Sequence, residues 1–438
     1  MRLRFPLIAA TLVALLMTLP TSGATFTDAT SSRVNEVGAR QPIRVTTYEI
    51  GTGVFTGTSY SLGLAQPLAP DYFVIMRGAA GANDSTTQRT PAQDYARVAA
   101  DPFGNFAGGS TGPSELRLAR GDASGSAWQG QITVVECLDS EDTAGFRLRG
   151  VAEPGLAANT TTGSAAVDTA WSSMSQVGLY GGYQGGGVET TATDRGDHMT
   201  AWGRVYPSGA NTANVERRAG YNPGNGQLSG TTTFSVYAVE WGSDWAIQRV
   251  TVSGNNAGNG VDATSEYNTA SITPVARANT FVLASGISDS SDLGRGWEGT
   301  VVTLGNGVNQ NASENRVAIG AESDANRKAE VYVHTHPRLA VDYRFGPDGS
   351  IGTNNLTGTQ IVAAAIVPDT YTGGGVARTS GWRVPIFTNT SNGNGTAYPR
   401  PIDWARHTGA TQITWTRSRS GQPAAYWLQS VDFGAIWR

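Results

Sequence analysis

Two histidines separated by one residue are the strongest metal-ligand candidates in the sequence. His334 and His336 lie in an apolar stretch that we predict to be a β-strand. Residues two apart in a strand point to the same face, so both imidazoles could reach one ion. A Zn²⁺ site would need one or two further ligands. The alternative is two exposed histidines on a strand near Pro337. We favour this alternative and assign no metal-ligating residue.

Acidic clusters are the candidates for calcium, which takes six to eight oxygen ligands. They lie at residues 139–142 (Asp-Ser-Glu-Asp), at residues 289–292 (Asp-Ser-Ser-Asp) and at Asp348. None of them follows the twelve-residue calcium-loop pattern. Asp and Ser also favour ordinary turns, because their side chains hydrogen-bond to nearby backbone groups. We therefore expect turns, predict no cofactor, and leave calcium open as the one candidate.

The motifs of common enzyme classes do not occur in this sequence. There is no Gly-x-Ser-x-Gly, His-Glu-x-x-His or phosphate-loop pattern. Glu136 and Glu240 occupy corresponding places in two similar segments. A glycosidase needs two carboxylates across one cleft, whereas one acid recurring in successive units indicates a repeated structural role. We predict a noncatalytic protein and assign no catalytic or cofactor-binding residue.

Tryptophans could stack on the faces of sugar rings or fill protein cores. Trp241 and Trp245 flank a predicted join between two units. Five more occur near the end of the sequence: Trp382, Trp404, Trp415, Trp427 and Trp437. We favour packing in cores and joins, with carbohydrate binding as the alternative.

The elements that would position these residues recur along the chain. A strand, a short polar break and a new strand follow one another with a period of about 100 residues. The closing strands are expected at residues 132–137, 234–241, 331–336 and 426–433, and the opening strands at residues 43–48, 146–150, 245–250 and 339–343. Between them we expect middle strands at residues 71–78, 198–206, 279–286 and 381–387, and polar linkers at residues 116–120 and 215–218.

The pattern predicts an all-β fold of four antiparallel β-sandwich repeats, of an immunoglobulin-like or jelly-roll-like kind, arranged end to end. Residues 412–417, for example, alternate polar and apolar types as a half-buried strand does. Gly-, Asn- and Pro-rich turns separate the strands. The expected boundaries of the repeats are 43–140, 146–242, 245–336 and 339–438.

The closing strands carry a resemblance to known proteins. Val-Val-Glu at 134–136 and Val-Glu-Trp at 239–241 resemble the strand that ends many tandem β-sandwich repeats of phage and virus structural proteins and of bacterial surface proteins. The third unit departs from this pattern, with Val-Tyr-Val-His at 331–334. The arrangement is also distantly similar to the H-type lectin sandwich. The resemblance implies an architecture and supplies no catalytic or binding residue.

The first residues have the features of a cleavable secretory signal. Arg2 and Arg4 precede an apolar run at residues 7–19, and Ser-Gly-Ala follows at 22–24. The run is short for a membrane span, although an uncleaved anchor is the alternative. We expect a signal peptide at 1–24, a mature chain without a transmembrane segment, and a location outside the cell or on its surface. Residues 25–42 are then a leader that is either disordered or adds a strand to a neighbouring subunit.

The charge and the cysteine content of the chain restrict the classes of function and of fold stabilisation that we expect. A net charge of −4 on 438 residues gives no basic footprint for nucleic acid. Cys137 is the only cysteine, so the chain cannot form an internal disulfide. We therefore predict an exported structural or surface protein, either a filament or coat subunit or an adhesive stalk. Its partner would be a further copy, a surface or a glycan. The alternatives are a glycan-binding array and a virion fibre or spike protein.

Overall fold

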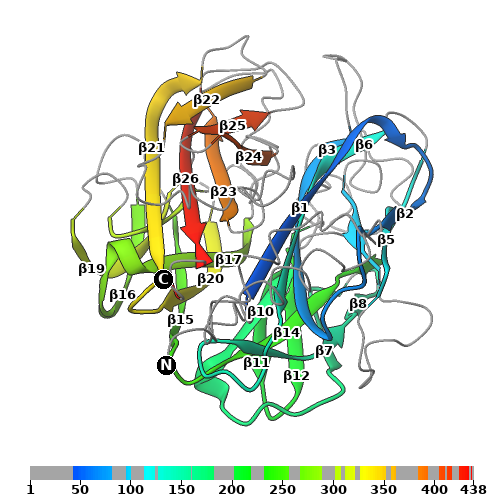
Figure 1. Cartoon of the computed structure of the whole chain (residues 1–438), viewed down its shortest axis with the longest axis horizontal. Helices are drawn as coiled ribbons and strands as arrows, with labels where there is room; N and C mark the ends of the chain where they lie inside the picture. Colours follow the sequence, from blue (N-terminus) through cyan, green and yellow to red (C-terminus); the bar gives the residue numbers. More distant parts are fainter. Residues whose placement is uncertain are drawn as a thin grey trace, which may run out of the picture. The chain divides into compact units, whose positions relative to one another are not determined.

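The computed structural model describes most of the chain after residue 42. The described residues are 43–80, 95–99, 113–123, 127–158, 160–181, 202–218, 231–255, 267–288, 301–306, 311–320, 326–351, 357–361, 383–392, 404–409, 412–416, 424–433 and 436. These residues form an all-β fold of several small antiparallel sheets (Figure 1). Their helical turns are short 3-10 segments such as η1 (Met174–Gln176) and η4 (Arg277–Asn279). Within this part of the chain, no helix has the length and apolar character needed to cross a membrane.

In each of the eight three-stranded sheets of the described residues, the strand that comes last in the sequence lies at the centre. Four of these sheets contain the predicted opening and closing strands. We number them sheets 1 to 4. Sheet 1 is β1 (Ile43–Phe55), β6 (Trp128–Cys137) and β3 (Asp71–Ala80); sheet 2 is β7 (Phe146–Ala152), β14 (Val236–Trp241) and β10 (Val177–Gly181); sheet 3 is β15 (Ala246–Asn255), β20 (Asn326–Thr335) and β17 (Thr280–Ser288); sheet 4 is β21 (Ala340–Ile351), β26 (Ala424–Asp432) and β23 (Arg383–Asn392).

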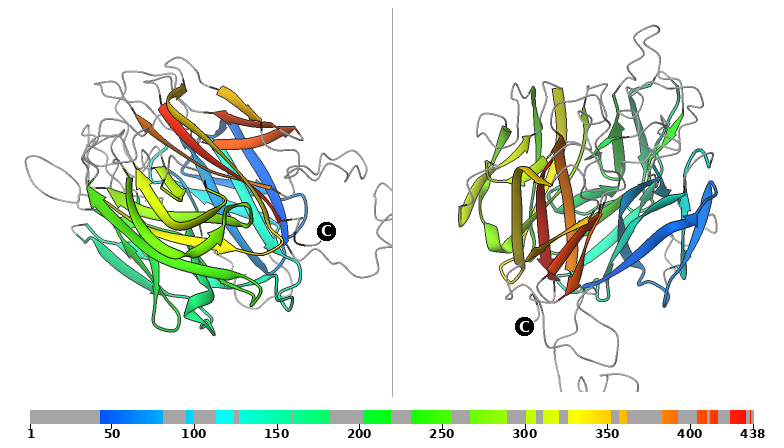
Figure 2. Two further views of the ribbon diagram at one scale, coloured as in Figure 1. Left: turned by 90° about the vertical axis from the view of Figure 1, so that its left-hand side faces the viewer. Right: turned by 90° about the horizontal axis from the view of Figure 1, so that it is seen from above.

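The remaining strands form smaller sheets, visible in the rotated views (Figure 2). They are β2 (Ser59–Gly63), β5 (Glu115–Ala119) and β4 (Arg97–Val98); β11 (Arg204–Ser208), β12 (Thr212–Glu216) and β9 (Thr162–Ala166); β16 (Tyr267–Ala276), β19 (Ser313–Gly320) and β18 (Val301–Leu304); β22 (Thr357–Ile361), β25 (Gln412–Thr416) and β24 (Trp404–Gly409); and the pair β13 (Thr232–Thr233) and β8 (Gly155–Leu156).

All of the predicted opening and closing segments contain strands of sheets 1 to 4. Two other expectations were wrong in part. The middle strand of sheet 2 is β10, whereas the described end of the predicted segment 198–206 belongs to β11 of a smaller sheet. β10 reads Val-Gly-Leu-Tyr-Gly, and its two glycines weaken the strand signal in the sequence.

The predicted polar linker at 116–120 belongs to β5 except for its last residue, and the first half of the linker at 215–218 belongs to β12. In β5 the side chains of Leu116 and Leu118 are buried, whereas Arg117 between them is exposed. This is the period of two that a half-buried strand requires. The arginines of this segment occupy the solvent-facing positions of that alternation or its end.

The central position of the closing strands explains their apolar sequences. All six residues of β14 are buried, because strands flank it on both sides and other sheets cover its faces. The opening strand β1 alternates instead: Val45 is fully buried, whereas its neighbour Thr46 is half-buried. An edge position does not by itself impose alternation, because the edge strand β3 is buried continuously from Tyr72 to Met76.

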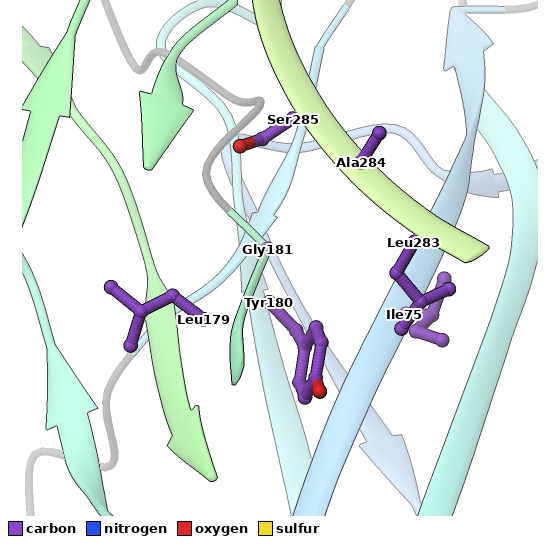
Figure 3. A pocket seen from close by; sticks show the side chains of 7 residues that line it. All are labelled: Ile75, Leu179, Tyr180, Gly181, Leu283, Ala284 and Ser285. Carbon is purple, nitrogen blue, oxygen red and sulfur yellow. The ribbon is translucent and has the colours of Figure 1, made fainter. Parts of the chain in front are cut away.

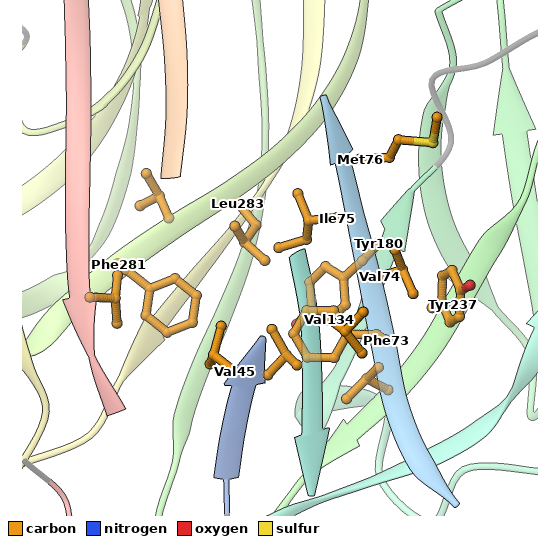
Figure 4. Close-up of a cluster of buried hydrophobic side chains, with 14 of the residues drawn as sticks. Val45, Phe73, Val74, Ile75, Met76, Val134, Tyr180, Tyr237, Phe281 and Leu283 are labelled. Atoms are coloured by element: carbon orange, nitrogen blue, oxygen red, sulfur yellow. The ribbon is translucent and has the colours of Figure 1, made fainter. Parts of the chain in front are cut away.

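One continuous hydrophobic cluster joins sheets 1 to 4. It includes Val45 of sheet 1, Trp241 of sheet 2, Phe281 of sheet 3 and Val431 of sheet 4, and Figure 4 shows part of it. A second cluster is separate from it and joins residues of sheet 2, such as Leu179 and Val236, to Val205 of β11 and Val215 of β12. Sheets 1 to 4 thus share one core, and sheet 2 also has a core of its own.

Side chains from one sheet also satisfy edge backbone groups of the next. Asp71 Oδ1 in sheet 1 accepts a hydrogen bond of 2.7 Å from the Leu148 amide in sheet 2. Gln429 in sheet 4 contacts Val282 in sheet 3 twice: its Oε1 accepts from the Val282 amide at 2.8 Å, and its Nε2 donates to the Val282 carbonyl at 3.0 Å. The side-chain amide thus replaces the peptide group of a neighbouring strand, and β17 does not offer these groups to another chain.

Gly181 at the end of β10 should tolerate no larger residue. Its φ of 94° lies in the left-handed region, and an added Cβ would collide with the Ser235 carbonyl oxygen. We expect Gly181→Ala to lower the free energy of unfolding by about 3 kcal/mol, measured by urea denaturation. Gly63→Ala is the matched control, because a Cβ there meets nothing within 4 Å. Equal stability of the two variants would contradict this account of β10.

Candidate functional site

A buried carboxylate joins three segments of sheet 1. Glu136 on the central strand β6 is 1 % exposed. Its two oxygens accept hydrogen bonds from Arg44 of β1, at 2.7 Å from Nε and 2.6 Å from a terminal nitrogen. Glu136 Oε1 also accepts from the Ala69 amide, at 2.9 Å, just before β3 begins. One side chain therefore fixes the opening strand and the approach to the middle strand.

Sheet 2 repeats this arrangement at the corresponding position. Glu240 on β14 pairs with Arg149 of β7. Its Oε1 accepts from the amides of Ser172 and Ser173 at 2.9 and 2.8 Å, in the segment that leads through η1 into β10. Burial alone would raise the pKa of Glu240, but these hydrogen bonds and Arg149 outweigh it and lower the pKa. The predicted structural role of Glu136 and Glu240 thus has a geometric basis.

A charged network joins sheet 3 to the smaller sheet of β11 and β12. Arg204 of β11 donates to Glu330 of β20 at 2.5 Å and to Glu216 of β12 at 2.9 Å. Lys328 of β20 reaches Glu216 at 3.0 Å, and Arg249 of β15 lies 3.3 Å from Glu330. Burial acts to raise the pKa of Glu216, but Lys328 and Arg204 outweigh it and lower the pKa.

His334 forms a buried hydrogen-bond chain between sheets 2 and 3. Its Nε2 lies 2.5 Å from the Tyr180 hydroxyl, and Trp241 Nε1 donates to that hydroxyl at 2.7 Å. An indole nitrogen can only donate. The Tyr180 oxygen therefore accepts from Trp241. We assign its own proton to the bond with His334 Nε2, because the opposite direction would leave the buried hydroxyl proton and Nδ1 both without a partner. The proton of the neutral imidazole must then lie on Nδ1, which has no hydrogen-bond partner among the described residues.

The groups around His334 come from all four sheets, and we call them the aromatic seam: Phe73, Tyr180, Trp241, Trp245, Phe281, His334 and Phe433. The His334 ring stacks on Phe281 of β17 with centroids 4.4 Å apart and an interplanar angle of 6°. Phe73 of β3 packs on Tyr180 at 4.7 Å, and Phe433, which follows β26, packs on Phe281 at 5.7 Å. Burial lowers the pKa of His334 to about 3, so the ring is neutral at neutral pH.

Both histidines are buried, so the expectation that they would be exposed was wrong. His336 has contacts different from those of His334. Its Nδ1 accepts from the Arg338 amide at 3.2 Å, and its ring packs on Trp245 with centroids 5.1 Å apart. Burial is the largest of the effects that lower the pKa of His336. Within the described ranges, no group of three His, Cys, Asp or Glu side chains is placed to hold a metal ion.

The acidic cluster at 139–142 forms a turn. Asp139 Oδ1 accepts from the Glu141 amide at 3.3 Å, and Asp142 Oδ1 accepts from the Ala144 amide at 2.9 Å. These are the local bonds expected of turn residues. Residues 289–292 and the side chain of Asp348 lie outside what the structure describes.

Trp241 and Trp245 are buried at the join between sheets 2 and 3, with ring centroids 4.5 Å apart. Trp245 Nε1 donates to the Ala144 carbonyl at 2.7 Å. These contacts agree with the predicted packing role. Trp382 and Trp437, and the side chains of the other three late tryptophans (Trp404, Trp415 and Trp427), lie outside the described part of the chain.

A half-open pocket lies beside the aromatic seam, between β3, β10 and β17 (Figure 3). It is small, and its lining is mostly apolar: Ile75, Leu179, Tyr180, Gly181, Leu283, Ala284 and Ser285. The Tyr180 hydroxyl is bound to Trp241 and His334. The Ser285 hydroxyl accepts from the Val205 amide at 2.9 Å. The pocket therefore lies where sheets 1, 2 and 3 meet, and the described hydroxyl groups in its lining already have hydrogen-bond partners.

Comparison with known proteins adds no family to this description: neither a protein-family model nor a curated protein matches the chain.

Replacing Glu136 by Gln should destabilise the fold, because Arg44 loses its carboxylate and Ala69 keeps only a weaker acceptor. Breaking a fully buried pair costs ~3–5 kcal/mol. The Arg44 side chain is 27 % exposed and can be hydrated, so we expect a loss of about 2 kcal/mol in urea denaturation. Glu141→Gln is the control, because its pair with Arg147 is exposed and should contribute under ~1 kcal/mol. A larger effect from Glu141→Gln would refute the assignment.

Replacing Tyr180 by Phe keeps the ring but removes the hydroxyl from the aromatic seam. Trp241 Nε1 and His334 Nε2 then both remain buried without a partner, at about 1–3 kcal/mol for each group. We expect thermal unfolding at a lower temperature, together with a change in the near-ultraviolet circular dichroism of Trp241. An unchanged melting temperature would show that the hydrogen-bond chain contributes nothing.

Proposed function

We propose that this chain is an exported, noncatalytic structural protein that acts as a subunit of a filament or coat. In this proposal each of sheets 1 to 4 packs with a smaller sheet as one β-sandwich, so that four sandwiches make up the subunit. The recurrence of one strand order in sheets 1 to 4 and in the four smaller three-stranded sheets carries the proposal, because arrays of similar units commonly build or cover surfaces.

The use of the buried acids supports a structural role. Glu136, Glu240 and Glu330 are each buried and each bound to an arginine. Two of them also hold the backbone that precedes a middle strand. Such groups fix the positions of strands and sheets rather than present a reactive oxygen to a ligand.

The shared core supports a subunit over an adhesive stalk. In a stalk, each domain contacts only its chain neighbours. Here the core joins all four sheets. In addition, β24, from the smaller sheet of β22, β25 and β24, lies against β6 of sheet 1. The sequence features at residues 1–24 support export, and the leader at 25–42 is the segment that we propose contacts the next copy.

Electron microscopy of the purified mature protein tests this function. We expect regular polymers or shells that form over a range of salt concentrations, because apolar burial and backbone hydrogen bonds are screened little by salt. A variant that starts at Pro42 should keep its β-type circular dichroism and lose assembly. Normal assembly of that variant would refute the role of the leader.

Isolated monomers in every condition, measured by light scattering, would contradict the subunit proposal as a whole. If those monomers also bound specific sugars on a glycan array, the glycan-binding alternative would replace it. Assembly only on a virion would favour the fibre or spike alternative.

A further inference from the structure

We infer that the aromatic seam is an acid-sensitive joint, at which protonation of His334 separates sheet 2 from sheet 3 while the sheets themselves persist. The inference rests on the geometry of His334 and is independent of the proposed function. It requires a titratable group at a contact between sheets, the absence of a compensating charge, and sheets whose own hydrogen bonds do not involve that group.

The first requirement is met by the position of His334. Its imidazole, 0 % exposed, belongs to sheet 3, whereas the hydroxyl that it binds and the indole behind that hydroxyl belong to sheet 2. Protonation would place a hydrogen on Nε2, where the Tyr180 hydroxyl now points its own proton. Tyr180 would then have to turn its proton toward apolar neighbours, which include Phe73.

The second requirement concerns the charges around the ring. The neighbouring residues on the elements packed against His334 are Tyr180, Trp241, Ile247 and Phe281, which carry no charge at neutral pH. On β20 the nearest titratable group is Tyr332, whose pKa is raised by burial, and the charged side chains of Arg327, Lys328 and Glu330 lie further along the strand. His336 follows the end of β20, and burial lowers its pKa. Glu330 is bound to Arg204 and Arg249, and Glu240 to Arg149. An imidazolium at position 334 would therefore be buried without a counter-ion.

The direction of the pH dependence follows from the lowered pKa of His334, about 3 in the closed seam. A histidine freed from burial titrates near its ordinary value of about 6.5. The opened state therefore binds a proton that the closed state does not, from about pH 6.5 downward. The closed seam is fully favoured above that pH and loses stability progressively toward about pH 3.

The third requirement follows from the strand pairing. β14 pairs with β7 and β10, and β20 pairs with β15 and β17, through backbone hydrogen bonds within each sheet. These bonds do not involve an imidazole. Opening at the seam would expose Phe281, Trp241 and the pocket residue Leu283 to water, without unpairing the strands that carry them.

The test is acid titration of the full mature protein from pH 7 to pH 3, followed by three signals. We expect tryptophan emission to shift to longer wavelength and an apolar dye, anilinonaphthalene sulfonate, to bind, while far-ultraviolet circular dichroism is retained. His334→Gln keeps an acceptor oxygen near Nε2 and cannot be protonated, so its midpoint should lie ~1 pH unit or more lower. His336→Asn is the matched control, and its midpoint should stay close to that of the wild type.

Hydrogen–deuterium exchange of the unmodified protein at pH 7 and pH 4.5, corrected for intrinsic rates, serves if the glutamine variant does not fold. The seam ends of β10, β17 and β20 should lose protection before the outer strands β2 and β16. Coincident acid profiles for wild type and His334→Gln, or uniform loss of protection across all strands, would overturn the inference. A shift caused by His336→Asn alone would assign the sensitivity to the other histidine.

Discussion

The closing strand of each sheet is the element on which the rest of the structure depends. It hydrogen-bonds to the opening strand on one side and to the middle strand on the other, so the sheet cannot exist without it. In sheets 1 and 2 it also carries the buried glutamate that holds both flanking segments. In sheet 3 it carries His334. The recurrent apolar segments, which are the clearest pattern in the sequence, are therefore the central strands of sheets 1 to 4.

The polar contacts and the apolar contacts of this fold have different consequences. Apolar packing supplies most of the stability and tolerates exchange among side chains of similar volume. A buried ion pair adds little beyond what apolar packing would supply, but it is costly to break. The pairs of Glu136 with Arg44 and of Glu330 with Arg204 therefore specify which segments meet, while the shared cluster makes the meeting favourable.

The sequence predicted the all-β class, the opening and closing strands, and a structural role for Glu136 and Glu240, because each of these follows from local pattern or recurrence. The sequence could not predict which side chains form hydrogen bonds or ion pairs with one another. Arg44 precedes Glu136 by 92 positions, and Tyr180 precedes His334 by 154, so both contacts depend on strand register and sheet packing. The middle strand of sheet 2 was not predicted for a local reason, because β10 is five residues long and contains two glycines.

The last-in-sequence position of each central strand also has a consequence for how the chain folds. The opening strand of sheet 1 must wait for a partner about ninety residues away, and sheet 2 has the same delay between Arg149 and Glu240. Contacts of such long range slow folding, because loop-closure entropy is lost before the native pairing compensates for it. During synthesis, each opening strand stays unpaired until nearly a whole unit has emerged. Because each sheet can close only when its last strand is available, sheets 1 to 4 would close one after another in chain order, each adding its side chains to the hydrophobic cluster that the earlier sheets have begun.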